Sequence, residues 1–266
     1  MKISLITIVN KEKVFDTFKR ELKKQQYVDY ELIKVNNDSN QFDSAGAALN
    51  RGASLAHGEY LVFLHPDIRF LDNYALKSIV DYLKKINDFG VIGVAGCPSM
   101  DQGNKILTNI VQGINKEKVG STICKLEEVQ TVDECFFIEK RTYFEKNHFS
   151  ESKGWHLYAV KQCLNAILKG KINYVVPADL WHLSPGNSEN MDYVKIGIRM
   201  AKKYKNEFST INTTVEKWYT SGVKSIYMPW FNFAMHKGKR WLSNYPNLYS
   251  KIKNIYFKLE RNSEYK

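Results

Sequence analysis

The sequence has few cysteines and prolines and no long apolar run. Its 266 residues include six prolines and four cysteines. The cysteines are widely spaced and form no CxxC pair, so the sequence indicates neither a disulfide framework nor a zinc site, and a reducing cytoplasm is expected. Cys135 and Cys163 lie in apolar patterns and are expected to be buried thiols. No run approaches the ~18 uninterrupted apolar residues that span a bilayer.

The N-terminal segment, MKISLITIVNKEK, lacks the features of a signal peptide. Its apolar stretch is short, ends at the polar residues 10–13, and has no small-residue cleavage site, so a first β-strand is expected there. A content of 44% hydrophobic and 25% charged residues is ordinary for a soluble globular protein. The length fits one large α/β domain, or a domain of about 180 residues with an appendage.

Acidic residues are scarce in the last third of the chain. Residues 1–184 carry 24 Lys and Arg against 22 Asp and Glu, whereas residues 185–266 carry 15 against 6. A basic and aromatic tail of this kind is expected to face something acidic: phosphate, anionic lipid or nucleic acid. The spacing of an RNA-recognition motif or a zinc finger is missing, so a nucleic-acid partner is not expected.

Strand-like and helix-like segments alternate through the first hundred residues. Periodicity predicts strands over 3–9, 30–35, 59–64 and 91–95, and helices over 11–26, 44–57 and from a cap at Asp72 to about residue 83. This alternation is typical of a parallel, doubly wound sheet. Residues 96–129 are loop-like, and further strands over 132–138 and 172–178 and helices over 155–168 and 189–204 are predicted.

The strand over 60–64 ends at His65-Pro66-Asp67. Pro66 cannot donate to a sheet ladder and pushes His65 away from helical geometry, so the strand must end here. An imidazole and a carboxylate are thereby placed at the carboxyl end of a buried parallel strand, where ligands bind in open α/β sheets. His and Asp form a reasonable half-site for a divalent cation that carries a phosphorylated substrate.

Several segments, taken in order, resemble the bacterial family 2 glycosyltransferases of the GT-A fold. They are the first strand ending in Asn10, VNNDS, AxNRGxxxAxGEYLVFLHPDI, VDECFFIEKRTYF, GWHLYAVxxCLxAxxxG and WHLSPG. The subgroup whose metal motif reads HxD in place of DxD is the most similar. The resemblance implies a GT-A, Rossmann-like, mostly parallel sheet flanked by helices, as a catalytic domain over residues 1–187. A helical, basic and aromatic extension over residues 188–266 would follow.

The resemblance also implies an activity. Such enzymes move a sugar from a nucleotide diphosphate sugar, here a UDP-sugar in the first place, to a glycan or lipid-linked acceptor in bacterial surface polysaccharide biosynthesis. They use Mn²⁺ or Mg²⁺ and invert the anomeric carbon. Sugar-phosphate nucleotidyltransferases need a GxGxR loop after the first strand, and residues 10–13 contain no glycine. A catalytically inactive GT-A-like protein that binds carbohydrate or nucleotide stays an alternative, because fold does not secure function.

The resemblance assigns donor and metal contacts by position. Asn10, Asn36, Asp38, Asn50 and Arg51 would contact the donor. Asn36 stands where the family reads uracil and ribose, while a plain turn is the alternative for Asp38. Arg51 would reach a phosphate or stay solvated.

The same resemblance identifies the metal ligands as Asp67, His65 and His182. His65 would ligate the metal or touch the ribose. His182, in LWHLSPG, would be a second protein ligand, although a histidine beside tryptophan and leucine is also typical of a core.

The general base departs from the family pattern. In family 2 glycosyltransferases, the helix that corresponds to the one predicted at Trp155 usually begins with an acidic pair. In this sequence the same positions hold Tyr158 and Ala159. Asp133 is the first candidate, with its neighbour Glu134 as a rival, His156 the second and Glu151 the third; an imidazole near pKa ~6.5 is an apt base.

The acceptor would stack on aromatic rings. Trp155 and Tyr158 offer such a platform, although aromatics at a helix start are also typical of a core.

The extension combines aromatic residues with cations over 227–242, and an apolar helical face is expected over 249–259. Aromatic rings favour the membrane interface and cations favour anionic headgroups. The sequence therefore suggests peripheral contact with the inner face of the cell membrane. Packing onto the catalytic body or onto a second subunit, as in a homodimer, is the alternative.

Overall fold

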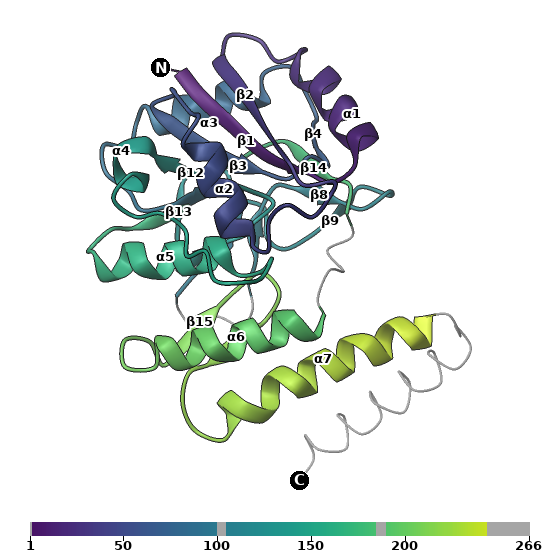
Figure 1. The fold of residues 1–266 in the computed structure, drawn as a ribbon, viewed down its shortest axis with the longest axis vertical. Helices are drawn as coiled ribbons and strands as arrows, with labels where there is room; N and C mark the ends of the chain where they lie inside the picture. The colour runs from purple at the N-terminus through teal and green to yellow at the C-terminus, as the bar shows by residue number, and fades with distance from the viewer. Residues whose placement is uncertain (1, 100–104, 185–189, 244–266) are drawn as a thin grey trace.

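A seven-stranded sheet forms the centre of the computed structural model, which describes residues 2–99, 105–184 and 190–243 (Figure 1). Its strand order is β10-β13-β5-β12-β3-β1-β2. All but two strands run in the same direction, because only β12 and β10 pair antiparallel with their neighbours. The strands are β1 (Lys2–Val9), β2 (Asp29–Asn36), β3 (Tyr60–Leu64), β5 (Ile92–Gly93), β10 (Glu127–Val129), β12 (Phe136–Lys140) and β13 (Asn173–Val175). The predicted mostly parallel α/β sheet is confirmed.

Helices cover both faces of this sheet. α1 (Glu12–Leu22) and α3 (Ala75–Leu83) pack on one face, and α2 (Ala45–Ala53), α4 (Arg141–Phe144) and α5 (Tyr158–Leu168) pack on the other. Every residue of β3 is buried, because successive side chains of a strand point to opposite faces and both faces carry helices. Val62 and Leu64 enter the first core, and Leu61 and Phe63 enter the second.

Two small sheets lie at the edge of the large one. One has the order β4-β14-β8-β9 and the other β11-β6-β7. β14 pairs antiparallel with β4, which sets His182 opposite Ile68 and close to Asp67. Their strands are β4 (Ile68–Phe70), β6 (Ala95–Cys97), β7 (Leu107–Thr108), β8 (Val111–Gln112), β9 (Glu117–Lys118), β11 (Thr131–Val132) and β14 (Leu180–His182). The loop-like prediction for 96–129 was wrong here, because strands of two or three residues leave no periodicity to detect.

Two predicted strands are each divided. The strand over 91–95 splits at Val94 into β5 and β6, and the strand over 132–138 splits into β11 and β12. In the second case the Oδ1 of Asp133 accepts a hydrogen bond from the amide of Cys135 at 2.9 Å, which closes an Asx turn. Asp133 and Glu134 therefore lie between two sheets and not at the start of a strand.

Several predicted helix ends were also wrong. The helix expected from residue 155 begins at Tyr158, because Leu157 has a left-handed backbone with φ of 61°. The helix N-cap placed at Asp72 is Tyr74, whose amide donates to Asp72 Oδ1 at 2.6 Å. The helices predicted over 11–26 and 44–57 end at Leu22 and Ala53, and the strand predicted over 172–178 ends at Val175.

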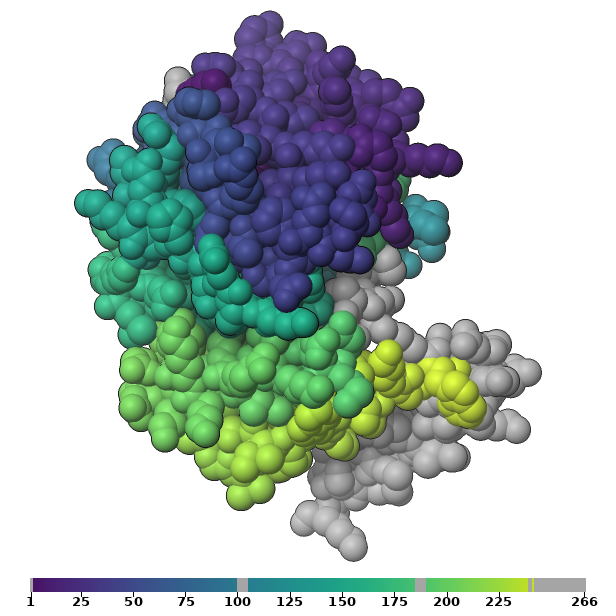
Figure 2. All heavy atoms as spheres, in the orientation of Figure 1, coloured from purple at the N-terminus to yellow at the C-terminus, as the bar shows by residue number. Residues whose placement is uncertain are grey.

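The extension packs on α5 through a core of its own. It consists of α6 (Met191–Lys203), the hairpin β15 (Thr210–Asn212) and β16 (Lys217–Tyr219), and α7 (Lys224–Ser243). Leu157, Val160 and Leu164 join this core with the fully buried Trp218, against which Gly197 of α6 lies. Figures 1 and 2 show α6 beside α5, with α7 beyond it.

The predicted helical extension is confirmed, although its hairpin was not predicted. The predicted boundary between residues 187 and 188 and the apolar face over 249–259 lie outside the described residues. No helix in the described part of the chain is long and apolar enough to cross a membrane.

Candidate active site

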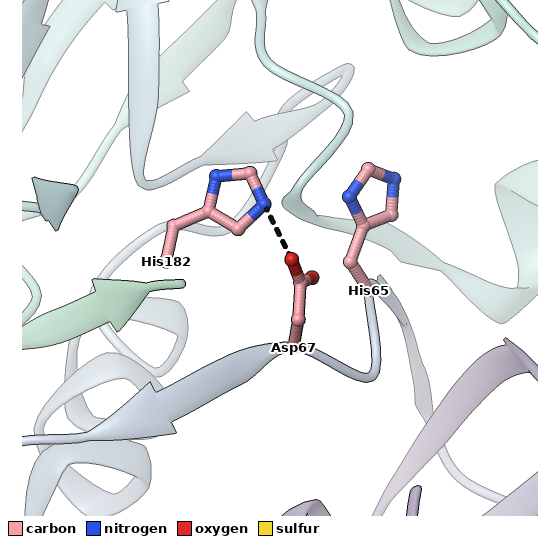
Figure 3. Close-up of side chains that lie close together, drawn as sticks. All are labelled: His65, Asp67 and His182. Atoms are coloured by element: carbon pink, nitrogen blue, oxygen red, sulfur yellow. Dashed lines mark ion pairs between the residues drawn. The ribbon is translucent and has the colours of Figure 1, made fainter. Parts of the chain in front are cut away.

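Three side chains converge where the large sheet meets the small sheet that contains β4 and β14 (Figure 3). His65 follows β3, Asp67 precedes β4, and His182 ends β14. One ligand atom from each lies within 4.8 Å of the others. In the described ranges this is the one group of three or more His, Cys, Asp or Glu side chains able to hold a metal ion. The structure thus brings together the three predicted metal ligands.

The His65-Pro66-Asp67 turn is fixed by backbone contacts on both sides. The amide of Ile68 donates to the carbonyl of His65 at 3.2 Å, and the amide of His65 donates to the carbonyl of Cys135 at 2.9 Å. The buried guanidinium of Arg69 donates to the carbonyl of Pro66 at 3.0 Å. These bonds fix the backbone from which the imidazole and the carboxylate project.

Asp67 and the two imidazoles shift one another's pKa values. Burial by itself would raise the pKa of Asp67, but the nearby His182 and His65 lower it to about 2. Burial lowers the pKa of His65 and proximity to His182 lowers it further. Burial also acts to lower the pKa of His182, yet Asp67 outweighs it and the net shift is upward.

The donor atoms fit a divalent cation. Nε2 of His182 lies 3.4 Å from Oδ2 of Asp67, but this buried nitrogen has no hydrogen-bond partner among the described residues. The ion pair with Asp67 thus lacks the geometry of a hydrogen bond, and a cation between the two groups would give this nitrogen a bonded partner. Nε2 of His65 lies 3.3 Å from the hydroxyl of Tyr158, which leaves its other ring nitrogen for a ligand. Two imidazoles and one carboxylate could therefore hold a metal here.

Two cavities meet at this group. A cavity of about 370 Å³ is lined by Asn10, Trp155 and Tyr158, and we call it the donor cavity after the ligand that we propose for it. A second one of about 340 Å³ is lined by Asp133, Glu134, His156 and His182, and we call it the acceptor cavity for the same reason. His65 and Asp67 line both cavities. Ligands in the two cavities would therefore approach one another at the group of three.

The two acids of the acceptor cavity have opposite environments. Burial acts to raise the pKa of Asp133, but hydrogen bonds from the Thr214 hydroxyl (2.5 Å) and the Cys135 amide lower it overall. Burial and the charge of Asp133 raise the pKa of Glu134 to about 8, although the amide of Tyr158 donates to its Oε1 at 2.6 Å. Of these two acids, Glu134 is thus the one poised to exchange a proton near neutral pH.

Other predicted site residues lie outside both cavities. The side-chain amide of Asn50 donates to Glu151 Oε1 and to the backbone carbonyl of Phe149, each at 3.0 Å. These two hydrogen bonds connect the loop before α5 to α2. Asn36 donates to Asp38 at 3.0 Å, and its own buried Oδ1 has no partner among the described residues. Arg51 is exposed. The structure does not gather these five side chains around the group of three.

Some site residues were missed from the sequence. Thr214 reaches the acceptor cavity from the hairpin of the extension, and Tyr193 of α6 packs edge-on against the ring of His156 with centroids 5.5 Å apart. Neither residue lies in a motif, and both are distant in sequence from Asp133. No local signal marks them, because only tertiary packing brings the extension to the site.

Comparisons with known proteins agree with this architecture. S. aureus TarS 1-349 in complex with UDP-GlcNAc matches with a TM-score of 0.55 and 16% identity, over 77% of this chain and 67% of that one. The longer S. aureus TarS structure matches with a TM-score of 0.52 and 16% identity, over 77% of this chain and 40% of that one, so this chain spans less than half its length. At such identities the likeness shows the GT-A fold alone.

One further structure and one sequence comparison complete the findings. The mannosyltransferase PcManGT from Pyrobaculum calidifontis, in complex with GDP-Man and Mn²⁺, has a TM-score of 0.48 and 12% identity, over 75% of this chain and 61% of that one. A search of curated protein sequences finds no significant match.

Comparison with family profiles identifies the family of this chain. Residues 4–208, well over half of the chain, match the profile described as "Glycosyltransferase like family". This range includes the large sheet except for the first two residues of β1, the three converging side chains and α6. The chain therefore belongs to the glycosyltransferase-like family and is a glycosyltransferase of the GT-A fold.

Proposed function

We propose that the protein transfers a sugar from a nucleotide diphosphate sugar to a glycan or lipid-linked acceptor, with a divalent metal and inversion, in bacterial surface polysaccharide synthesis. The single observation that carries this proposal is that His65 and Asp67 line both cavities. A sugar nucleotide with its diphosphate at these residues would present its anomeric carbon toward the second cavity. A UDP-sugar is our first choice of donor, since TarS of the same fold binds UDP-GlcNAc.

His65, Asp67 and His182 are the proposed ligands of the metal. Mn²⁺ is favoured over Mg²⁺, because Mg²⁺ prefers oxygen donors and holds its water, whereas two of the three proposed ligands are imidazoles. When bound, the cation supplies Lewis-acid stabilisation of the charge that develops on the departing nucleoside diphosphate. Asn10, beside the end of β1, lines the donor cavity and is a proposed donor contact.

Glu134 is the proposed general base, in preference to Asp133. Both line the acceptor cavity, but the carboxylate oxygens of Asp133 accept from Thr214 and Cys135, and its pKa is lowered. The pKa of Glu134, raised to about 8, is closer to the pH at which proton transfer is efficient. The acceptor hydroxyl would give its proton to Glu134 as its oxygen bonds to the anomeric carbon. The bond from that carbon to the diphosphate breaks, and its electron pair leaves with the diphosphate.

His156 is a proposed acceptor contact, and Trp155, predicted from the sequence as an acceptor platform, is proposed to contact the donor instead. His156 lines the acceptor cavity and Trp155, which is 37% exposed, lines the donor cavity. The ring contact of His156 with Tyr193 orients it, so we assign it to positioning. Glu151 accepts a hydrogen bond from Asn50 and is the weakest of the three general bases predicted from the sequence.

A thermal-shift panel tests the proposal. UDP-GlcNAc and other nucleotide sugars should raise the melting temperature only with Mn²⁺ present, because a ligand that binds the native state stabilises it. Asp67→Asn should lose this response. Asp29→Asn should keep it, since exposed Asp29 begins β2 at the opposite end of the strands. Stabilisation of Asp67→Asn equal to that of the native protein would contradict the metal assignment.

Peripheral contact with an anionic membrane is a second part of the proposal. α7 exposes large apolar side chains, among them Tyr227 (47%), Phe231 (54%) and Trp241 (58%), beside exposed Lys224 and Lys237. Aromatic rings and cations together suit the surface of a bilayer with anionic headgroups.

Vesicle co-sedimentation of the full chain tests this contact. Tyr227→Ser/Phe231→Ser should lower binding to vesicles that contain phosphatidylglycerol. Ile114→Ser is the matched control, because Ile114 is 92% exposed but lies between β8 and β9 on the catalytic body. Vesicle binding that falls equally in Tyr227→Ser/Phe231→Ser and in Ile114→Ser would favour the alternative in which α7 contacts a second subunit. The absence of vesicle binding by the native protein at low salt would favour it as well.

A further inference from the structure

A third cavity, of about 790 Å³, lies between α6 and the segment that leads into α5. Its lining includes five cationic side chains, Lys153, Lys161, Lys195, Arg199 and Lys203, against two acidic ones, Asp43 and Asp192. We call it the basic cavity. His156 lines both the basic cavity and the acceptor cavity. The basic cavity is therefore next to the place proposed for the acceptor hydroxyl.

The cations of the basic cavity come mainly from one face of α6. Lys195, Arg199 and Lys203 follow at intervals of four along α6, so they share one face of that helix. Lys161 of α5 lines the same cavity and is half-buried. Burial lowers the pKa of Lys161, and the charges of Arg199 and Lys203 lower it further, although Glu134 opposes them. Like charges this close are unfavourable in the protein alone.

The acids within the described ranges leave this group largely unneutralised. Asp43 lies 3.9 Å from Lys153, and both side chains are largely exposed. Among the described residues, no carboxylate lies within 4 Å of Lys161, Lys195, Arg199 or Lys203. Cations concentrated in a concave site attract an anion from solution. An anionic ligand would relieve the repulsion that the fold tolerates here.

We infer that the basic cavity binds a phosphate group of the acceptor, which holds the acceptor with its hydroxyl in the acceptor cavity. This inference rests on the proposed function. A guanidinium beside several ammonium groups suits the multiple oxygens of a phosphate. The diphosphate of the donor is not the ligand, because His65, Asp67 and His182 line the other cavities and not this one.

Two kinds of acceptor carry such a group: a lipid diphosphate and a glycan whose units are joined by phosphodiesters. Isothermal titration calorimetry of the full chain with farnesyl diphosphate and with a glycerol phosphate trimer separates them. EDTA and the absence of nucleotide exclude binding through a metal. The probe that binds more tightly identifies the kind of acceptor, and binding should weaken with salt.

The test variant is Arg199→Gln/Lys203→Gln. It should bind the preferred probe at least ~10-fold more weakly, because each removed cation takes away a charge-assisted hydrogen bond. Lys202→Gln/Lys205→Gln is the matched control: it removes the same charge from the same region, but neither residue lines the cavity. The control should bind within about 2-fold of the native protein, as surface charges contribute little. Lys195→Gln provides a milder second variant.

Three outcomes would overturn the inference. They are no binding of either probe at low salt, an equal loss in the test and control variants, and an unchanged affinity in the test variant and in Lys195→Gln. Failure of the proposed function is a different result, since it would appear as no metal-dependent stabilisation of the native protein by any nucleotide sugar. Metal-dependent stabilisation without probe binding would leave the function standing and refute the basic cavity alone.

Discussion

Gly197→Ala should destabilise the protein, although the same change stabilises most helices. Gly197 lies inside α6, where alanine is favoured over glycine by about 1 kcal/mol in an ordinary helix. A Cβ at this position would come closer than 2.5 Å to three ring atoms of Trp218. That ring is fully buried and packs against Tyr193 with centroids 5.5 Å apart, so it has little room to retreat.

The magnitude follows from these two opposing effects. Overpacking a filled core costs about 1–3 kcal/mol, and three close ring contacts place Gly197→Ala at the upper end. Subtracting the helix preference leaves a loss of roughly 2 kcal/mol in the free energy of unfolding. For a chain of this size, that corresponds to a fall of roughly 4–8 °C in melting temperature.

Gly238→Ala is the matched control. Gly238 lies in α7, and a Cβ there would meet no heavy atom within 4 Å. It should therefore gain up to about 1 kcal/mol from helix preference alone. Urea unfolding followed by circular dichroism at 222 nm compares both variants with the native protein. If Gly197→Ala proves as stable as Gly238→Ala, the extension accommodates the methyl group and the packing argument for α6 fails.

Three further changes test the site. Glu134→Gln should lower the transfer rate about 100-fold and abolish a rise in kcat/KM between pH 6 and 8, because the base is active only when deprotonated and its pKa is about 8; a rise that persists in the variant would exclude Glu134. His182→Ala should weaken Mn²⁺ binding about 10- to 100-fold in calorimetry, since one of three protein ligands is lost, and unchanged affinity would remove His182 from the site. Thr214→Val should cost about 1–3 kcal/mol in urea unfolding, because Asp133 loses a hydrogen-bond donor; no change would show that water replaces it.

The parts of this protein that were predictable from sequence depend on local rules. The stop at Pro66 follows from proline geometry, and the burial of residues 60–64 follows from their unbroken apolar run. The division of the strand over 91–95 was not predictable in this way. There the chain passes from the large sheet to a small one, and a Cβ at Gly93 would meet the side chain of Val132, a residue far away in sequence.

The candidate site shows the same limit. His65 and Asp67 are only two positions apart in sequence, and the motif itself indicates them. Of Asp133 and Glu134, only Glu134 has a raised pKa, partly because Thr214 donates a hydrogen bond to Asp133. Thr214 belongs to the extension and lies in no recognisable motif. The contribution of the extension to the acceptor and basic cavities therefore required the structure.

Tyr158 gives the two proposed substrates a means of influencing one another. Its hydroxyl lies 3.3 Å from Nε2 of His65, while its amide donates to Glu134 at 2.6 Å. A displacement of α5 on filling the acceptor cavity would thus alter the surroundings of a metal ligand. Thermodynamic linkage makes this effect reciprocal: whatever factor the acceptor applies to metal and donor affinity, they apply to the affinity for acceptor. Random and ordered addition of substrates then differ in rate but reach the ternary complex at the same free energy.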